Sequence, residues 1–363
     1  MDNIRWVTVL LVLFYHVIYF YNAKGVFGGI GGFYEDQPWD AIMSLLYPWF
    51  MMLLFLVAGI SSKYALERLS HKEFIKSRTR KLLVPATIGL FVFQWMVGYF
   101  NTHVAGTDVM ANVPQPAKYF MWAVSGIGPL WFVQDLWLFS LLLVLIRLIE
   151  KDKLYEYIGK LFQGDSFGKS IALVVVGYFL IWGGAQCSIS HPDPESLQGL
   201  WNLYRPFAYL IPFLLGYFVF SHDVVQNRIQ RMRFPLLVFT ITTGAVFTIV
   251  MYGKNDTDPI VLKSWLCNLF AWLTILAMLG CFKAWANKTS PFATYMTKSS
   301  YGAYVLHYLV VASLGYMMKV HTTLAPWSQY VILFVAVMTV PFLLNEIIKR
   351  IPFIRWCVLG IKK

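Results

Sequence analysis

Long apolar runs follow one another along the whole 363-residue chain, with short polar connections between them. A helix needs about 20 mostly apolar residues to cross a bilayer, because all its backbone hydrogen bonds must be made internally. Runs of this length predict an all-α, polytopic integral membrane protein of about ten spans. They leave no stretch for a separate soluble domain, so we expect one membrane-embedded domain over residues 1–363. The predicted spans are 4–22, 41–62, 82–101, 129–148, 169–186, 204–221, 234–252, 264–283, 300–318 and 328–348.

The basic residues are divided unevenly between alternate connections. If the N-terminus lies in the cytoplasm, 24 of the 30 Lys and Arg residues fall in inner segments. This asymmetry is what the positive-inside rule requires of ten spans with both termini in the cytoplasm. The remaining six are Lys24, Lys118, Arg205, Lys254, Lys263 and Lys319. Membrane orientation thus accounts for the net charge of +12, and no RNA-binding signature or zinc-finger spacing indicates a nucleic-acid partner.

The composition is typical of a membrane protein, and the cysteine and acidic residues do not indicate a metal-binding site. Hydrophobic residues make up 58% of the chain and charged residues 13%, where soluble domains carry about 25% charged residues. The four cysteines form no C-x-x-C pair, so we expect small apolar residues and not a disulfide frame or metal site. His191, Asp193 and Glu195 could contact a cation, but prolines interrupt their run, and we expect no metal there.

The first predicted span carries two ionisable residues, Arg5 and His16. Eleven helical positions place them within about 20° of one face and about 16 Å apart along the axis. Ionisable groups inside a membrane usually face a protein interior or a water-filled cavity. Arg5 would then lie at the cytoplasmic interface and His16 near the bilayer midplane. A histidine packed and bonded against a neighbouring helix is the alternative explanation of His16.

This spacing suits acyl transfer from coenzyme A. Phosphates near Arg5 would let an extended pantetheine arm, of the same order as the gap of about 16 Å, bring a thioester to His16. A neutral imidazole there could accept the proton of an acceptor hydroxyl as general base. The basic segment HKEFIKSRTRKLLVP adds Arg78, Arg80 and Lys81, whose cationic groups suit phosphate oxygens. Anchoring to lipid headgroups is the alternative role of that segment.

Several motifs carry a resemblance to one family. DNIRW with Arg5, ten intervening residues and His16 resembles the signature of the acyltransferase 3 family of bacterial membrane proteins. LFLVAGISS is similar to its F-L-x-S-G-F pattern, with Ala58 where serine is common, and RTRKLLVP to R-x-x-R-L-L-x-P, with Lys81 in place of arginine. GPLWFVQDL resembles the L-W-F-L motif, and YGAYVLHYLVV resembles S-Y-x-I-Y-L-x-H-x-P, with Val310 where proline is frequent. These motifs follow the family's order over most of the chain.

The resemblance implies an enzyme of the bacterial cytoplasmic (inner) membrane. It would move an acyl group, acetyl or succinyl, from cytoplasmic acyl-CoA to a hydroxyl of a glycan or other acceptor outside. The glucan-modifying branch, which includes the periplasmic-glucan succinyltransferase, is the branch it most resembles. Acyl-CoA, the acceptor and membrane lipid are the expected partners, and the sequence indicates no oligomeric state.

Four further polar residues are candidates for the site. Asp135, in the outer half of the fourth span, could orient or charge-balance His16 or help bind the acceptor; a structural interhelical bond is equally consistent. His307, about two turns into the ninth span, could line the donor channel or be structural. Asp40 and Arg205, at the outer ends of their spans, are expected to bind the acceptor, with interface anchoring the alternative for Arg205.

Other mechanisms and functions stay open. The acceptor could attack the thioester directly, or His16 could carry the acyl group transiently. A transporter of a glycan intermediate or small polar solute would also place charges inside the membrane. A sensor or scaffold would not need His16. The chain has no H-E-x-x-H or G-x-S-x-G motif of zincins or hydrolases.

Overall fold

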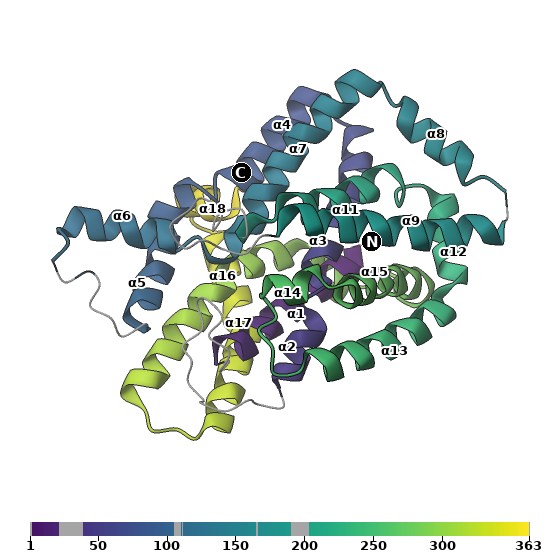
Figure 1. The fold of residues 1–363 in the computed structure, drawn as a ribbon. Helices are drawn as coiled ribbons and strands as arrows, with labels where there is room; N and C mark the ends of the chain where they lie inside the picture. Colours follow the sequence, from purple (N-terminus) through teal and green to yellow (C-terminus); the bar gives the residue numbers. More distant parts are fainter. Residues whose placement is uncertain are drawn as a thin grey trace. The chain divides into compact units, whose positions relative to one another are not determined.

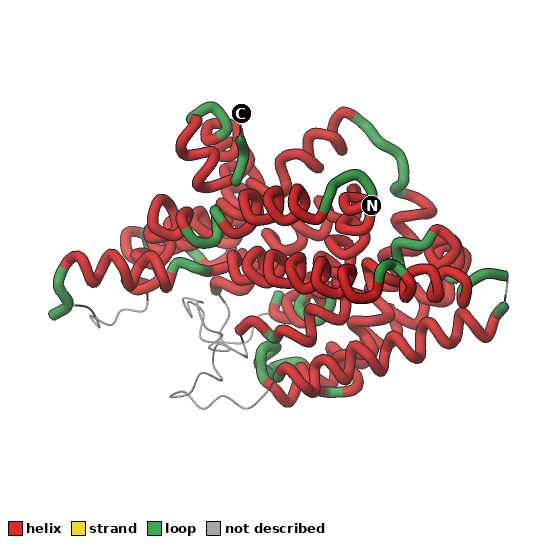
Figure 2. The backbone as a smooth tube through the Cα atoms, turned by 90° about the horizontal axis from the view of Figure 1, so that it is seen from above, coloured by secondary structure: helices red, strands yellow, loops and turns green. Residues whose placement is uncertain are grey.

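The computed structural model describes residues 2–21, 39–104, 110, 112–164, 166–189 and 203–362. All regular structure in these ranges is helical (Figure 2), which confirms the all-α prediction. Eight helices there are long and apolar enough to cross a membrane, or up to nine if a bent pair with a 106° break is one span. The protein is therefore a polytopic membrane protein.

The eight candidate spans are α1 (Asp2–Phe20), α2 with α3 (Asp40–Leu46 and Phe50–Leu66), η3 with α7 (Gly128–Leu130 and Trp131–Glu150), α9 (Phe167–Ser188), α13 (Arg233–Met251), α15 (Trp265–Trp285), α16 (Pro291–His321) and α17 (Pro326–Ile348). The bent pair is α11 (Pro206–Phe218) with α12 (Asp223–Arg231).

The predicted span over 82–101 is not a single helix. It consists of two π-helical turns, η1 (Thr79–Leu83) and η2 (Leu90–Gln94), followed by α5 (Trp95–Val104). Pro85 lies in the break, because proline has no N–H to donate and its ring clashes with the carbonyl four residues earlier. That carbonyl belongs to Lys81, and the hydroxyl of Tyr301 donates a hydrogen bond to it. A side chain thus replaces the backbone donor that proline lacks.

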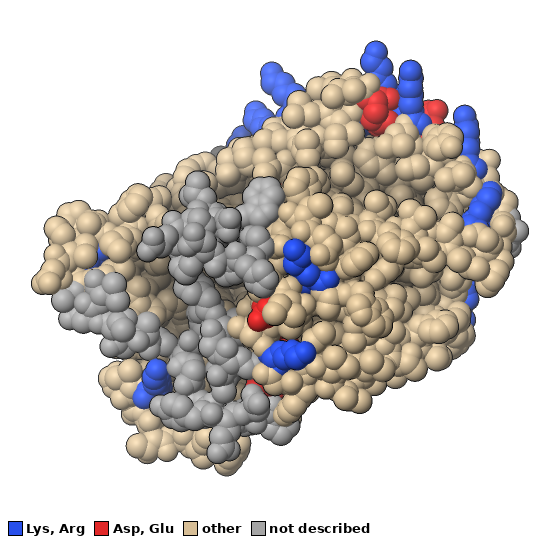
Figure 3. All heavy atoms as spheres, viewed as in Figure 1, with Lys and Arg blue, Asp and Glu red and all other residues tan. Residues whose placement is uncertain are grey.

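Short helices occupy several predicted connections. They are α4 (His71–Arg78), α6 (Gln115–Ser125), α8 (Lys153–Leu161), α14 (Pro259–Lys263) and α18 (Pro352–Leu359). Large apolar side chains are exposed on α6 and α8, as with Phe120 and Tyr157. A helix with one apolar face and one charged face can lie in the plane of a bilayer surface. Lys and Arg side chains gather at the edge where α7 ends and α8 begins (Figure 3), in a segment predicted to be cytoplasmic.

The chain forms two compact units. The first unit consists of Met1–Thr8, Ser44–Ile75 and Leu138–Ala293, and the second of Val9–Met43, Lys76–Trp137 and Thr294–Lys363. Both units are discontinuous in sequence, so each depends on contacts between distant parts of the chain.

Glycines bring two helices of the first unit into backbone contact. A Cβ atom at Gly59 of α3 would lie 2.0 Å from the backbone oxygen of Phe213 on α11. A Cβ atom at Gly216 of α11 would lie 2.0 Å from the backbone oxygen of Leu56 on α3. Small residues of this kind let membrane helices approach closely. The two helices therefore lie side by side with no room for a side chain at either glycine (Figure 1).

A tryptophan joins two other helices of the first unit. Trp272 of α15 is fully buried, and its ring packs where Gly177 of α9 leaves space for it. Its indole N–H donates a 2.9 Å hydrogen bond to the backbone oxygen of Val174. The aromatic ring thus packs without leaving its polar group unsatisfied.

Side-chain-to-backbone hydrogen bonds fix α16 in the second unit. The Tyr304 hydroxyl donates to the Pro129 oxygen at 2.6 Å, and Gln94 donates to the Val305 oxygen at 3.0 Å. Gln134 donates to the Ala86 oxygen at 2.9 Å. Buried polar groups in a membrane protein must find such partners. The first two bonds hold the part of α16 that carries His307, and the third joins α7 to the segment between η1 and η2.

Candidate active site

His16 lies on α1 and is held by a bond within its own helix. Its Nδ1 atom is 2.8 Å from the backbone oxygen of Val12, one turn earlier. A carbonyl oxygen can only accept a hydrogen bond, so Nδ1 of His16 must carry the proton in this contact. The ring is partly buried within the second unit.

The structure brings His307 of α16 directly against His16. The two ring centroids are 4.9 Å apart, and Nε2 of His307 lies 3.3 Å from Nδ1 of His16. On its other side, Nδ1 of His307 is 2.6 Å from the Tyr304 backbone oxygen. The side chain of His307 is completely buried.

These contacts determine where the protons sit on both rings. Nδ1 of His307 must donate to the Tyr304 oxygen, since a carbonyl cannot donate. Nε2 of His307 then accepts, because the atom facing it, Nδ1 of His16, is already the donor to Val12. The neutral His16 ring therefore carries its lone pair on Nε2. A histidine in this tautomer can accept a proton from a substrate through Nε2.

Aromatic side chains surround the His16 ring. The rings of Tyr15, Tyr19 and Tyr308 lie with centroids 5.3 to 5.7 Å from it. Tyr308 also packs against Gly128, whose φ of 41° is in the left-handed region that favours glycine. The aromatic wall around His16 is therefore built from α1 and α16, and η3 packs against Tyr308 in that wall.

Asp135 of α7 is buried in the same unit, with 4% of its surface exposed. No described residue hydrogen-bonds its Oδ2 atom, which is also buried. In the described part of the chain, the histidine partner of His16 is His307, and no hydrogen bond joins Asp135 to either ring. The carboxyl group thus lies in the second unit without the contact to His16 that was one of its predicted roles.

Arg5 occupies the first turns of the helix that carries His16. Its guanidinium lies 3.6 Å from the Asp2 carboxylate, and its side chain is 40% exposed. Because α1 runs without a break from Asp2 to Phe20, the predicted separation of about 16 Å along the axis applies to this helix.

The basic segment begins on α4, and a capping box formed by Ser70 and Glu73 stabilises the N-terminus of this helix. The Ser70 backbone N–H and hydroxyl both donate to Glu73, and the Glu73 N–H donates back to the Ser70 hydroxyl. Hydrogen bonds from the Ser70 side chain and backbone lower the pKa of the Glu73 carboxyl. Arg78 ends this helix, and the π-helical turn η1 follows at once.

Arg80 and Lys81 lie on η1 beside the C-terminal segment. Nε of Arg80 donates to the Gly360 backbone oxygen at 3.3 Å. A Cβ atom at Gly360 would lie 2.2 Å from the Arg80 backbone oxygen, and φ at this glycine is 61°. Residues 79–83 and the end of α18 therefore pack backbone to backbone.

The two residues predicted for the acceptor lie in different units. Asp40 begins α2 and is completely buried in the second unit. Arg205 lies in the first unit, just before α11, with a left-handed φ of 45°. Its guanidinium donates to the Tyr47 hydroxyl at 2.8 Å and lines a small cavity with Tyr209 and Asn268. Their assignment to the acceptor stays a prediction, and each residue is described within its own unit.

No group of three or more His, Cys, Asp or Glu residues that could hold a metal ion occurs among the described residues. The run His191, Asp193 and Glu195 lies outside the described residues, as does most of the outer segment 23–40. Sequence reasoning did not find the pairing of His16 with His307 or the roles of the Val12 and Tyr304 carbonyls. The helical spacing of Val12 with His16 and of Tyr304 with His307 could have suggested the two carbonyl contacts.

Comparison with known proteins supplies the family. No curated protein and no solved structure shows significant similarity to the chain. The model of the acyltransferase 3 family, described as an acyltransferase domain, matches residues 1–346. This match covers nearly the whole chain, including all of the first unit, the second unit up to residue 346 and every candidate residue discussed above. The chain therefore belongs to the acyltransferase 3 family of membrane-bound acyltransferases.

Proposed function

We propose that this membrane-bound acyltransferase moves an acetyl or succinyl group from cytoplasmic acyl-CoA to a hydroxyl of a glycan or other acceptor. The acceptor would lie on the outer side of the bacterial cytoplasmic membrane. The observation that carries the proposal is the contact of His16 with His307, which leaves Nε2 of His16 as a proton acceptor. Succinylation of a glucan, as in the glucan-modifying branch, is one form of this proposal.

His16 acts as general base in the proposed reaction. Its Nε2 takes the proton of the acceptor hydroxyl while the hydroxyl oxygen attacks the thioester carbonyl carbon. The new C–O bond forms, the C–S bond breaks, and the electron pair leaves with the CoA sulfur. The imidazolium then protonates the thiolate, which gives free CoA and restores neutral His16. No acyl-enzyme is needed in this sequence.

His307 positions the base and does not touch the reacting atoms. Its Nε2 and the Val12 oxygen both accept from Nδ1–H of His16, so they fix the tautomer and the ring orientation. The same acceptors stabilise the positive charge that His16 gains during the reaction. We therefore assign to His307 a positioning role in place of the donor-channel role that its place in the sequence suggested.

The donor and acceptor ends of the reaction use different residues, basic ones for the donor and both acidic and basic ones for the acceptor. Arg5, Arg78, Arg80 and Lys81 would hold the CoA phosphates, with Arg5 on the same helix as His16. Arg80 uses its Nε–H for the hydrogen bond to Gly360, and its terminal NH2 groups would donate to phosphate. Asp135, Asp40 and Arg205 would serve the acceptor side, and the whole chain would act as one catalytic domain.

The test is acyl-CoA turnover by the purified full-length protein in lipid nanodiscs. Acetyl-CoA and succinyl-CoA are supplied separately with gluco-oligosaccharides, and both free CoA and acylated sugar are measured. We expect transfer by the wild type and a loss of at least a hundredfold in His16→Ala with acyl-CoA binding retained.

The controls separate the mechanisms and the rival functions. Acyl-histidine trapped by rapid quench with acyl-CoA alone would replace direct transfer by a covalent intermediate. Full transfer by His16→Ala would remove His16 as the base. If the wild type neither binds acyl-CoA nor releases CoA, the donor assignment fails and transport of a polar solute becomes the better explanation.

A further inference from the structure

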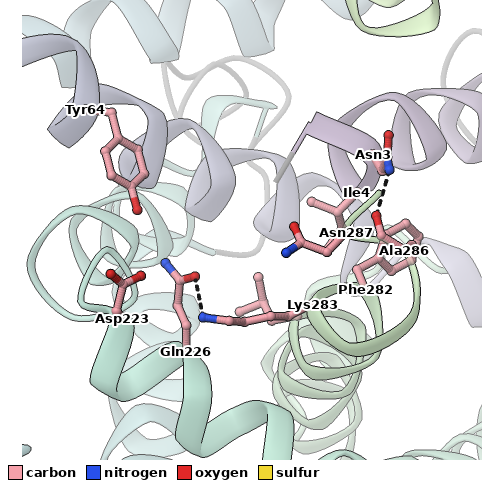
Figure 4. Close-up of a pocket in the computed structure, with 10 residues that line it drawn as sticks. Asn3, Ile4, Tyr64, Asp223, Gln226, Phe282, Lys283, Ala286 and Asn287 are labelled. Atoms are coloured by element: carbon pink, nitrogen blue, oxygen red, sulfur yellow. Dashed lines mark hydrogen bonds between the residues drawn. The ribbon is translucent and has the colours of Figure 1, made fainter. Parts of the chain in front are cut away.

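A polar cavity of about 250 Å³ lies in the first unit and shares no lining residue with the histidine pair. Figure 4 shows side chains from α12, α15, α3 and the start of α1 around it. Its polar lining is Asn3, Tyr64, Asp223, Gln226, Lys283 and Asn287. Its apolar lining is Ile4, Leu279, Phe282 and Ala286. All of the segments that supply the polar lining are predicted to be cytoplasmic.

Opposite charges line this cavity without pairing with each other. The Lys283 ammonium donates to the side-chain oxygen of Gln226 at 3.3 Å. Asp223 lies on the other side of Gln226 in Figure 4, and among the described residues no ion pair joins it to Lys283. A neutral amide therefore separates one cation from one anion, and both line the same space.

The spacing of these charges limits what could bind. Asp223 and Gln226 are three residues apart on α12, so their Cβ atoms are about 5–6 Å apart. Lys283 lies beyond Gln226, so the two charges are separated by more than one side chain. A ligand that met both would carry an ammonium and an anion several bonds apart. The adjacent charges of an α-amino acid would not reach, and Asp223 would repel a polyanion.

We propose that this cavity binds a zwitterion of the phosphoethanolamine type. The ammonium would donate hydrogen bonds to Asp223 and the Tyr64 hydroxyl, and the phosphate would accept from Lys283 and Asn287. At about 250 Å³ the cavity suits a group of this size and is smaller than most sites for drug-sized molecules. Two sources share this chemistry: the headgroup of phosphatidylethanolamine and free phosphoethanolamine.

The apolar part of the lining agrees with a lipid as one source. Ile4 and Leu279 are buried, and Phe282 lies near the end of the membrane-spanning helix α15. A headgroup entering from the bilayer would place its glycerol region against such side chains. The proposal does not depend on acyl transfer, since none of the lining residues belongs to the proposed catalytic or CoA-binding set.

Native mass spectrometry of the full chain tests the proposal. Detergent-solubilised protein is titrated with phosphatidylethanolamine, phosphatidylcholine or phosphatidylglycerol, and the bound lipids are counted. We expect phosphatidylethanolamine to bind about tenfold more tightly than the others. Phosphatidylcholine has no N–H to donate to Asp223, and phosphatidylglycerol has no cation.

Matched variants locate the site. Asp223→Asn and Lys283→Gln should each weaken phosphatidylethanolamine binding about tenfold, while Lys288→Gln, outside the lining on the following segment, should not. Acyl-CoA turnover of each variant is measured in parallel and reports separately on the proposed function.

The second arm uses free phosphoethanolamine, with binding followed by the rise in unfolding temperature. If free phosphoethanolamine displaces the lipid from the wild type and has no such effect in Asp223→Asn, the proposal is supported and both molecules bind the same site. Binding of free phosphoethanolamine without selective lipid binding would assign the site to the soluble molecule. Equal binding of all three lipids together with no response to phosphoethanolamine, or unchanged binding in both variants, would overturn the proposal.

Discussion

Nε2 of His307 lies 3.3 Å from Nδ1 of His16, although 291 positions separate the two residues in the chain. Each ring also has its Nδ1 on a backbone carbonyl, which leaves only one consistent arrangement of the protons. The proton acceptor of the pair is therefore Nε2 of His16, and the identity of that atom depends on a residue from another helix.

The positioning role of His307 predicts unequal effects for two substitutions. His307→Gln can place its side-chain oxygen near the position of Nε2 and still accept from Nδ1–H of His16, whereas His307→Leu cannot. We expect His307→Gln to keep at least ten times the kcat of His307→Leu, with KM for acyl-CoA changed less than threefold in both. The measurement is steady-state acyl transfer at several pH values.

A merely structural histidine would behave differently. Both variants would then lose activity in proportion to folded protein, and neither the kcat-to-KM split nor the pH profile would separate them. Unfolding temperature and the yield of monodisperse protein supply this control.

Asp135 should be dispensable for folding. Its buried Oδ2 has no hydrogen-bond partner among the described residues, and a buried polar atom in this condition costs about 1–3 kcal/mol. Asp135→Asn should therefore leave the unfolding temperature unchanged or raise it, while transfer falls at least tenfold if the carboxyl serves the acceptor. A lowered unfolding temperature with activity proportional to folded protein would assign Asp135 to a structural interhelical bond.

The contact between α3 and α11 should not tolerate a methyl group. Gly59→Ala or Gly216→Ala would bring Cβ to 2.0 Å from a backbone oxygen of the facing helix, so the helices must separate. We expect each to lower the free energy of unfolding by about 1–3 kcal/mol, as for overpacked cores. Gly183→Ala on α9 is the control, since nothing lies within 4 Å of its added Cβ. Equal unfolding temperatures for all three variants would contradict this packing.

The hydrogen bond from Tyr301 to the Lys81 oxygen predicts a coupling with Pro85. Tyr301→Phe removes the donor and should cost about 0.5–1.5 kcal/mol of stability. In a Pro85→Ala background the new N–H at position 85 can donate to the same carbonyl, so Tyr301→Phe should cost less. A double-mutant cycle of unfolding free energies measures the difference. Strict additivity would mean that the tyrosine does not replace the missing backbone donor.

The apolar runs were enough to predict the helical membrane class, because length and hydropathy alone decide whether a helix can cross a bilayer. The same reasoning treated 82–101 as one span, since the disruption by Pro85 and two π-helical turns does not alter the hydropathy of that segment. The short helices α6 and α8 were taken as loops, because their apolar residues are too few to register as spans.

Part of the candidate site could likewise be predicted from the sequence, and part depends on how the helices pack. Helix periodicity was sufficient to place Arg5 and His16 on one helix. It could not show that His307 meets His16, because that contact depends on how α1 and α16 pack. It also could not show the left-handed backbone at Arg205, which no propensity of arginine favours.

The π-helical turn η2 affects how the protein would respond to the deletion of a single residue. A single π-helical turn holds one residue more than an α-helical turn, so removing one of its residues can restore regular α-helix. The helix after it, α5, would keep its orientation, whereas one deletion inside α1 would rotate everything beyond it by about 100°. Within the described chain, η2 (Leu90–Gln94) is therefore a place where the loss of one residue would be accommodated without turning α5 about its axis.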